Sequence, residues 1–238
     1  MSEAETRRLS KVVAALVPCS RREAEQYITE GWVRVAGQLV EEPQHRVGTE
    51  LVEVDPKARL QAAAPATMLV HKPAGMGVAD AQALIAVATH WVGDVSGIRR
   101  VKSHAVGVVP LLALPVPASG LCVFSQDGRI IRKLHEDANV IEQELVAEVT
   151  GTIAANGLER LCGGLVFEGQ ALPPARVSWQ SEARLRFAVK GIAPDMVPWM
   201  CTQVGLKLKA LKRIRIGRVP MAGLPPGQWR YLTPGEKF

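Results

Sequence analysis

The chain has 238 residues, 47% of them hydrophobic, and this is enough for one or two domains with a packed core. A mean hydropathy of +0.08 argues against a disordered chain. The polar N-terminus, and the lack of an apolar run of about 18 residues, argue against a secretion signal or a membrane span, so we expect a cytoplasmic protein. The four widely spaced cysteines form no Cys-x-x-Cys pair, so we expect neither a metal site nor a cofactor.

The positive charge is concentrated at the C-terminus. Residues 1–60 carry 9 Lys and Arg against 10 Asp and Glu, whereas residues 201–238 carry 8 against 1. A local excess of this kind favours a polyanionic partner. The alternative is a surface that only keeps the protein in solution.

The first 55 residues predict two short helices followed by small strands. Apolar residues spaced on one helix face predict a helix over 8–17, which Pro18 ends. Ser20 and Glu23 then form a capping box for a second helix that ends at Gly31. Strands are expected at 32–35, 38–40 and 50–55, the first two joined by an Ala-Gly turn.

This segment resembles a known RNA-binding domain. The run Cys19-Ser-Arg-Arg-Glu-Ala-Glu-Gln-Tyr-Ile, followed by Gly31, Val33, Val35 and Gly37, is similar to the domain named after ribosomal protein S-four. The resemblance implies contacts with structured RNA from Arg7, Arg8, Lys11, Arg21 and Arg22. The two arginines in the first helical turn could instead be simply solvated, although cations there oppose the helix dipole.

A Pro- and Ala-rich stretch then predicts a linker, and we divide the chain into residues 1–58, a linker at 59–67 and a second domain at 68–238. The second domain opens with Met68-Leu-Val-His-Lys-Pro-Ala-Gly, a strand that runs into a turn. This opening resembles that of bacterial pseudouridine synthases of the RsuA and RluF type. Further along, helices are expected at 81–92, 129–135, 158–162 and 196–204, and strands at 121–124, 141–149, 166–169, 175–179 and 183–189.

Basic and apolar residues nearly alternate over residues 205–217. The alternation predicts a strand with Lys207, Lys209, Arg213 and Arg215 on one face, and a bulge near Leu211-Lys212. The pattern that follows, Gly-Leu-Pro-x-Gly-x-Trp-Arg-x-Leu-Thr, is similar to the end of the same synthases. With Ser-Gly-Leu-x-Val-Phe-Ser-x-Asp-Gly in the middle, the resemblance covers most of residues 8–233.

The resemblance implies an aspartate-dependent isomerisation of uridine, but this chain lacks the residues that the resemblance leads us to expect for it. Synthases of this type carry the aspartate in Gly-Arg-Leu-Asp-x-x-Thr/Ser-x-Gly-Leu. When Gly120-Leu121 fixes the register, the aspartate position is Pro115 and the arginine position is Ala113. Proline has no ionisable group. The site aspartate must act on the nucleotide after it is flipped from its stack, so we predict no catalytic residue at this position.

Two further positions depart from the resemblance. Its base-stacking tyrosine is Leu145 here, and its basic helix is Pro194-Asp-Met-Val-Pro-Trp-Met. In the resemblance, the basic helix supplies the cation that pairs with the aspartate. A buried cation without a partner is costly, so the loss of the cation together with the aspartate is physically coherent. Asp127, Asp94 and Asp195 are the candidates for a relocated carboxylate, and Cys122, inside an apolar strand, is expected in the core.

We therefore expect an α+β protein with a small α-rich RNA-binding domain and a mixed, mainly antiparallel sheet domain. The favoured function is binding of structured RNA, such as ribosomal RNA, by a monomer that has lost catalysis. It would use Arg7, Arg8, Lys11, Arg21, Arg22 and the basic strand. Two alternatives stay open: an active synthase with a relocated carboxylate, and a protein-interaction adaptor.

Overall fold

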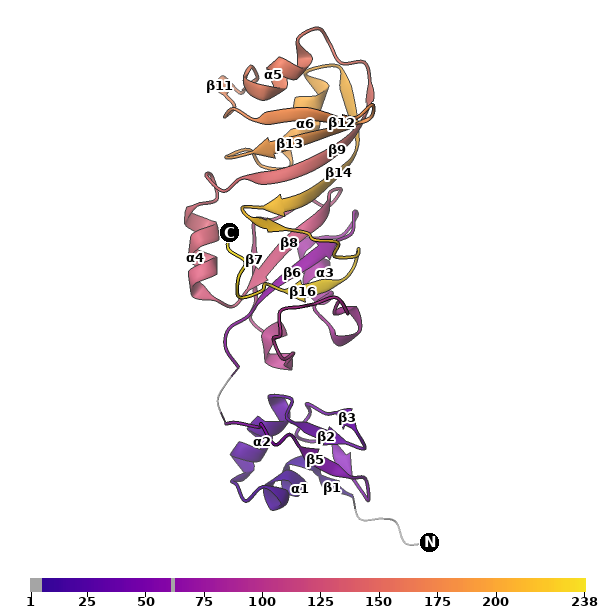
Figure 1. Ribbon diagram of the computed structural model, residues 1–238, viewed down its shortest axis with the longest axis vertical. Helices are drawn as coiled ribbons and strands as arrows, with labels where there is room; N and C mark the ends of the chain where they lie inside the picture. The colour runs from indigo at the N-terminus through magenta and orange to yellow at the C-terminus, as the bar shows by residue number, and fades with distance from the viewer. Residues whose placement is uncertain (1–5, 61–62) are drawn as a thin grey trace. The chain divides into compact units, whose positions relative to one another are not determined.

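The computed structural model describes residues 6–60 and 63–238, which form two compact units. The first comprises the described residues up to Pro65 together with Ile98–Gly107, and the second comprises Ala66–Gly97 and Val108–Phe238. Residues 98–107 thus group with the first unit, although the sequence placed them within the second domain. Figure 1 shows the elements of both units.

The first unit contains two helices and two small sheets. Its elements are β1 (Arg7–Arg8), α1 (Leu9–Leu16), α2 (Arg21–Thr29), β2 (Val33–Val35), β3 (Gln38–Leu39), β4 (Arg46–Val47), β5 (Val52–Val54) and the 3-10 helix η2 (Lys102–Ala105). The predicted capping box is present, because Ser20 Oγ accepts from Glu23 N–H and Glu23 accepts from Ser20 N–H. The core packs α1 and α2 on β2 through Leu9, Val13, Ala24, Ile28, Val33, Val35 and Val47.

Residues 98–107 are held to this unit by cation contacts. The Arg99 guanidinium lies 3.5 Å from the centre of the Trp32 ring. Arg100 pairs with Glu41, and Lys102 pairs with Glu42 at 2.9 Å. The sequence showed these cations only as an unassigned basic cluster.

The second unit is built on a nine-stranded sheet in the order β12-β13-β9-β14-β8-β6-β16, with β15 beside β14 and β7 beside β8. Its strands are β6 (Thr67–Lys72), β7 (Val109–Leu111), β8 (Ser119–Ser125), β9 (Gln143–Gly151), β12 (Arg176–Ser181), β13 (Arg184–Val189), β14 (Leu206–Ile216), β15 (Val219–Pro220) and β16 (Trp229–Tyr231). The pairing of β14 with β8 is parallel and the other named strand pairs of this sheet are antiparallel, so the sheet is mixed, as predicted.

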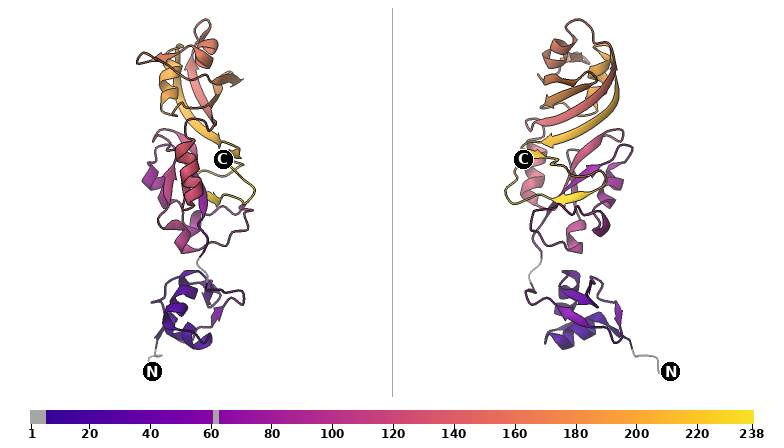
Figure 2. Two further views of the ribbon diagram at one scale, coloured as in Figure 1. Left: turned by 90° about the vertical axis from the view of Figure 1, so that its left-hand side faces the viewer. Right: turned by 45° about the vertical axis from the view of Figure 1, so that its right-hand side comes forward.

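Short helices and a small hairpin complete this unit. They are α3 (Val78–Ala83), the 3-10 helix η1 (Val87–Thr89), α4 (Gly128–Glu136), α5 (Gly157–Gly163), α6 (Met196–Thr202), β10 (Val166–Phe167) and β11 (Gln170–Ala171). α5 packs on β12 and α6 packs on β14. The long helix expected over 81–92 is broken into α3 and η1, because Ala86 between them has an extended backbone, with φ −129° and ψ 166°. In the right-hand view of Figure 2, β9 and β14 are the long curved strands that run together.

The predicted bulge in β14 lies elsewhere. The register with β9 shifts between Leu208 and Ala210 and again between Arg213 and Arg215. Each extra residue reverses the inward and outward alternation that follows it. The prediction that Lys207, Lys209, Arg213 and Arg215 share one face is therefore wrong: Arg213 points into the protein and is 0% exposed.

The parallel pairing of β8 with β14 requires a glycine. Gly120 has a φ of +116°, and a Cβ at this position would lie 2.2 Å from the Arg213 carbonyl oxygen. The obstacle is backbone, so it cannot move aside as a flexible side chain can.

We expect Gly120→Ala to destabilise the second unit by more than about 3 kcal/mol, because the added methyl group forces β8 and β14 apart. Thermal unfolding followed by circular dichroism measures the effect. Gly128→Ala is the matched control, since nothing lies within 4 Å of a Cβ there and Gly128 begins a helix. Equal unfolding temperatures for the two variants would contradict the strand approach described above.

Candidate functional site

The segment expected to hold a catalytic aspartate is a short loop between β7 and β8. Pro115 is half-buried, and its carbonyl accepts a hydrogen bond from Ala118 N–H at 3.0 Å. Leu114 and Ala118 are buried on either side of it. The loop therefore anchors itself in the core through apolar side chains, and position 115 itself brings no acid or nucleophile.

A buried lysine fixes this loop. Lys72, at the end of β6, is 0% exposed, and its Nζ donates to the carbonyls of Pro73, Met76, Val116 and Ala118 at 2.6–3.2 Å. Burial lowers the pKa of this amine. The ammonium has three N–H donors for these four carbonyl oxygens, so at least one N–H is shared between two of them. The four contacts tie the turn after β6 to the loop before β8.

A second buried cation lies in the neighbouring strand. Arg213 donates from Nε to the Leu121 carbonyl at 2.8 Å and from Nη1 to Gln143 Oε1 at 2.8 Å. Its Nη2 lies 4.0 Å from Cys122 Sγ. Burial lowers the pKa of Arg213 and raises that of the Cys122 thiol. Among the described residues the structure gives Arg213 no carboxylate partner, and a neutral amide stands where an ion pair would be expected.

The two remaining positions of the resemblance are apolar and packed. Leu145 lies in β9 directly opposite Arg213 in β14 and is 0% exposed. Trp199, in α6, packs edge-to-face on Phe167 with ring centres 5.0 Å apart. The sequence analysis predicted that the basic helix would lose its cation together with the aspartate. The helix α6 indeed holds no Lys or Arg, but Arg213 of β14 places a buried cation in the sheet opposite Leu145.

A hollow of about 250 Å³ lies beside Gln143. Three segments form it: the loop after β7, the turn after α4 and the chain that leads into α6. Its lining residues are Leu112, Ala113, Ala138, Asn139, Gln143, Gly191, Ile192, Ala193 and Pro194. These include two amide side chains but no acid, base or strong nucleophile.

The carboxylates considered as replacements have structural partners or lie outside the hollow. Asp127 caps α4 and pairs with Arg129 at 2.9 Å, whose hydrogen bonds lower the pKa of the carboxyl. Asp195 is exposed and is not part of the hollow's lining, although it follows Pro194.

Asp94 joins the loop before residue 98 to β16. Its Oδ2 lies 2.8 Å from His90 Nε2 and accepts from Tyr231 N–H at 2.9 Å. Burial raises the pKa of Asp94, but these hydrogen bonds and one from Ser96 N–H outweigh it, so the pKa is lowered. Asp94 thus has the environment of a structural carboxylate.

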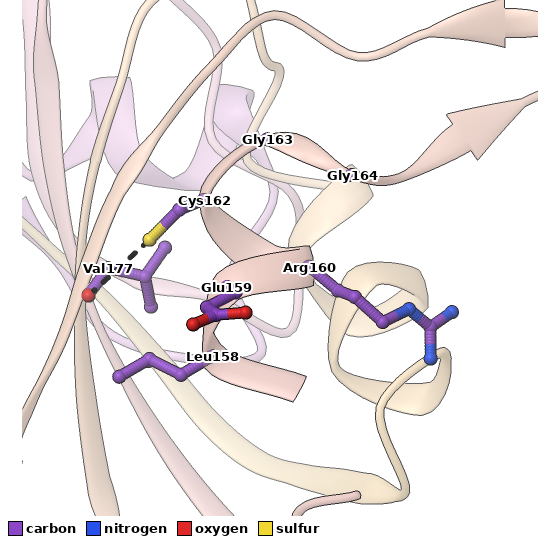
Figure 3. A pocket seen from close by; sticks show the side chains of 7 residues that line it. All are labelled: Leu158, Glu159, Arg160, Cys162, Gly163, Gly164 and Val177. Atoms are coloured by element: carbon purple, nitrogen blue, oxygen red, sulfur yellow. Dashed lines mark hydrogen bonds between the residues drawn. The ribbon is translucent and has the colours of Figure 1, made fainter. Parts of the chain in front are cut away.

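The most voluminous of the described hollows lies elsewhere. Figure 3 shows it against α5, lined by Leu158, Glu159, Arg160, Cys162, Gly163, Gly164 and Val177, with a volume of about 560 Å³. Cys162 Sγ lies 3.7 Å from the Val177 carbonyl. The Arg160 side chain points away from Glu159 in this view, so no acid and base converge here.

The first unit brings two of its predicted RNA contacts together. Arg8 and Arg21 line a hollow of about 280 Å³ with Ser10, Glu25, Pro43 and Gln44. Arg7, Lys11 and Arg22 are exposed but outside its lining. Arg21 also pairs with Glu25 at 3.0 Å, a contact that orients the guanidinium at the rim.

The basic strand contributes fewer exposed cations than its sequence indicated. Lys207 and Lys209 are exposed, whereas Arg213 is enclosed and Arg215 pairs with both Glu142 and Glu144. Alternation alone could not reveal this, because the two bulges change which side chains face outward. The sequence analysis also overlooked the role of Lys72, because its only sequence signal is a Lys-Pro-x-Gly turn.

Other kinds of site find no support in the described ranges. There, no three His, Cys, Asp or Glu side chains gather as a metal site would require. No helix among residues 6–60 and 63–238 is long and apolar enough to span a bilayer.

Comparison with known proteins agrees with this architecture. Residues 7–52 match the S4 domain family. The chain is 26% identical over 231 residues to the dual-specificity RNA pseudouridine synthase RluF of Escherichia coli K12. The match covers 96% of this chain and 76% of that protein. Over most of its length the chain is thus similar to RluF-type pseudouridine synthases.

Further matches extend over the same length. The ribosomal large subunit pseudouridine synthase B of Bacillus subtilis 168 is 28% identical and covers 96% of this chain and 93% of its own. A crystal structure of a pseudouridylate synthase superposes with a TM-score of 0.60 at 18% identity, covering 95% of this chain and 96% of that chain, and it shows a shared fold. The predicted resemblance and fold class are thereby confirmed.

We expect Lys72→Met to destabilise the second unit by about 3 kcal/mol or more, because four carbonyls in buried or part-buried hydrogen bonds lose their donor. Chemical denaturation measures the change in unfolding free energy. Lys209→Met, at an exposed position of the same unit, should change it by no more than about 0.5 kcal/mol. An equally small effect of Lys72→Met would show that the loop does not depend on this amine.

Proposed function

We propose that this protein binds structured RNA on a pseudouridine synthase scaffold and does not isomerise uridine. The observation that carries the proposal is the environment of Arg213. A fully buried guanidinium is satisfied by a carbonyl and by Gln143, with no described carboxylate beside it. The scaffold has thus kept a buried cation while the expected aspartate position is Pro115.

The hollow beside Gln143 supports the same proposal. Glycosidic-bond chemistry on uridine needs a group that can attack carbon or carry a proton. The lining offers amide groups and backbone instead. Leu145, where the resemblance implies a tyrosine, is packed in the core and leaves no aromatic side chain there to stack on a flipped base.

RNA binding is supported by the S4 domain and by the relatives. RluF and pseudouridine synthase B are named for action on RNA and on the large ribosomal subunit, so ribosomal RNA is the substrate class from which we infer this protein's ligand. Arg8 and Arg21 are placed to hold a backbone phosphate, since planar guanidinium groups bind phosphate oxygens in pairs. A monomeric state and a cytoplasmic location stay predictions.

The second candidate is an active synthase that uses Asp195, the one proposed carboxylate next in sequence to the hollow's lining. Asp195 is exposed, takes part in none of the ion pairs found among the described residues and is not part of the hollow's lining, which argues against this candidate. A protein-interaction adaptor would give neither RNA turnover nor salt-dependent RNA binding.

We expect no tritium release from ribosomal RNA labelled with 5-tritiated uridine above that of a protein-free control. The reason is the missing carboxylate at position 115. The E. coli RluF protein serves as the positive control. Release that continues over several turnovers, and that Asp195→Asn, Asp127→Asn or Asp94→Asn abolishes, would establish the active-synthase alternative instead.

We expect the double variant Arg8→Gln/Arg21→Gln to bind ribosomal RNA roughly tenfold more weakly at 0.1 M salt. The slope of log K against log salt should fall by about one to two, because up to two phosphate contacts are lost. Filter binding across a salt series measures both. Lys57→Gln/Arg59→Gln is the matched control, because both residues are exposed in the same unit and lie outside the hollow. Equal losses in the two double variants would mean that only net charge matters.

A further inference from the structure

One face of the large sheet carries a group of exposed and half-buried cations, of which the sequence analysis assigned only Lys207 and Arg215 to RNA binding. Ion pairs join Arg176 to Glu142, Arg186 to Glu144 and Arg215 to both glutamates, so these side chains lie on the same face. Strand register adds Lys212, opposite Val146, to this face. We call it the basic sheet face, defined by Arg176, Arg184, Arg186, Lys207, Lys212 and Arg215.

This face is opposite the one that holds Arg213. Along β9, Gln143, Leu145, Ala147 and Val149 are buried on one side, and their partners in β14 are Ile216, Arg213, Leu211 and Leu208. The alternate residues Glu144, Val146, Glu148 and Thr150 belong to the basic sheet face. The basic sheet face is thus separated from the hollow beside Gln143 by the thickness of the sheet.

The basic sheet face is open to solvent. Arg176, Ser178, Gln180, Arg184 and Arg186 are all exposed along β12 and β13, and Lys207 is exposed at the start of β14. Arg176 has 80% of its side chain exposed despite its ion pair. Between Arg176 and Arg186 lies a hollow of about 270 Å³, lined also by Glu144, Ser178 and Ala188.

The cations on this face fall into two groups. Glu142 and Glu144 hold three arginines, and hydrogen bonds from Arg215 keep the pKa of both glutamates low. Arg184, Lys207 and Lys212 take part in none of the ion pairs found among the described residues; Lys212 and Arg186 flank Val146, and Glu148 lies opposite Arg184. Six cations against three carboxylates leave a surplus of three positive charges.

The composition of the face distinguishes between polyanionic partners. Stable protein–protein interfaces need buried aromatic or large apolar anchors. The apolar side chains that the described strands place on this face are Val146, Ala188 and Ala210, all small or medium in size. Cations interleaved with the short polar side chains of Ser178 and Thr150 suit a sugar–phosphate backbone, most of whose contacts come from such groups.

We propose that the basic sheet face binds the phosphodiester backbone of RNA, as a second contact surface beside that of the S4 domain. This inference rests on the proposed RNA-binding function. The glutamate-held arginines supply preoriented guanidinium groups, and Arg184, Lys207 and Lys212 supply the charge that phosphates neutralise. The contact is to backbone, so it adds affinity without sequence preference.

The test is the triple variant Arg184→Gln/Lys207→Gln/Lys212→Gln, measured by filter binding of ribosomal RNA at a series of salt concentrations. Loss of three phosphate contacts should lower the slope of log K against log salt by about two, and the affinity at 0.1 M salt by at least about tenfold. The control Arg132→Gln/Arg160→Gln/Lys237→Gln removes the same charge from exposed positions of the same unit that lie in none of the strands forming this face.

The outcomes separate this inference from the proposed function. If the unaltered protein binds RNA with a steep salt dependence and the triple variant matches the control, the basic sheet face is not an RNA surface and the proposed function stands. If the unaltered protein shows no salt-dependent binding, the proposed function itself fails. Circular dichroism should show unchanged unfolding temperatures for both triple variants, because none of the replaced side chains is buried and none takes part in an ion pair found among the described residues. Binding of an acidic protein but not RNA by the unaltered face would also overturn the inference.

Discussion

Two buried cations and the neutral oxygens around them organise the second unit. Lys72 and Arg213 both lie opposite Gly120 in β8, one through β6 and the other through β14. Between them they bind carbonyls from the turn after β6, the loop before β8 and β8 itself. Burying a charge costs several kcal/mol unless it is well solvated by the protein. Here backbone carbonyls and one amide provide that solvation, so any change to the loop also changes how the two cations are satisfied.

This arrangement is consistent with the proposed function, in which a synthase-like scaffold binds RNA without isomerising uridine. The sheet order, the loop before β8 and the buried Arg213 together form the scaffold. Gln143 Oε1 accepts a hydrogen bond from Arg213, so the guanidinium does not require a charged partner. Apolar residues then complete the packing at positions 114 and 145. A scaffold stabilised in this way can devote its surface to binding, because no strained or ionised group must be kept in the hollow.

Charge is used differently on the two units and on the two faces of the sheet. In the first unit, Arg8 and Arg21 meet at one hollow. In the second, Glu142 and Glu144 pair with three arginines of the basic sheet face, and no ion pair among the described residues involves its two lysines. A backbone-reading protein gains from several modest positive surfaces, since each neutralised phosphate adds affinity independently of sequence.

The sequence alone determined the S4 domain, its capping box and the order of most strands, because these depend on local pattern and on residue identity; it also shows a proline, Pro115, where the resemblance implies an aspartate. It did not determine which cations are exposed. The bulges at Lys209 and Ile214 reverse the alternation of β14, and only pairing with β9 decides where they occur. The burial of Arg213, the carbonyl cage of Lys72 and the return of residues 98–107 to the first unit depend on contacts between segments far apart in the chain, and such contacts leave no periodic signal in the sequence.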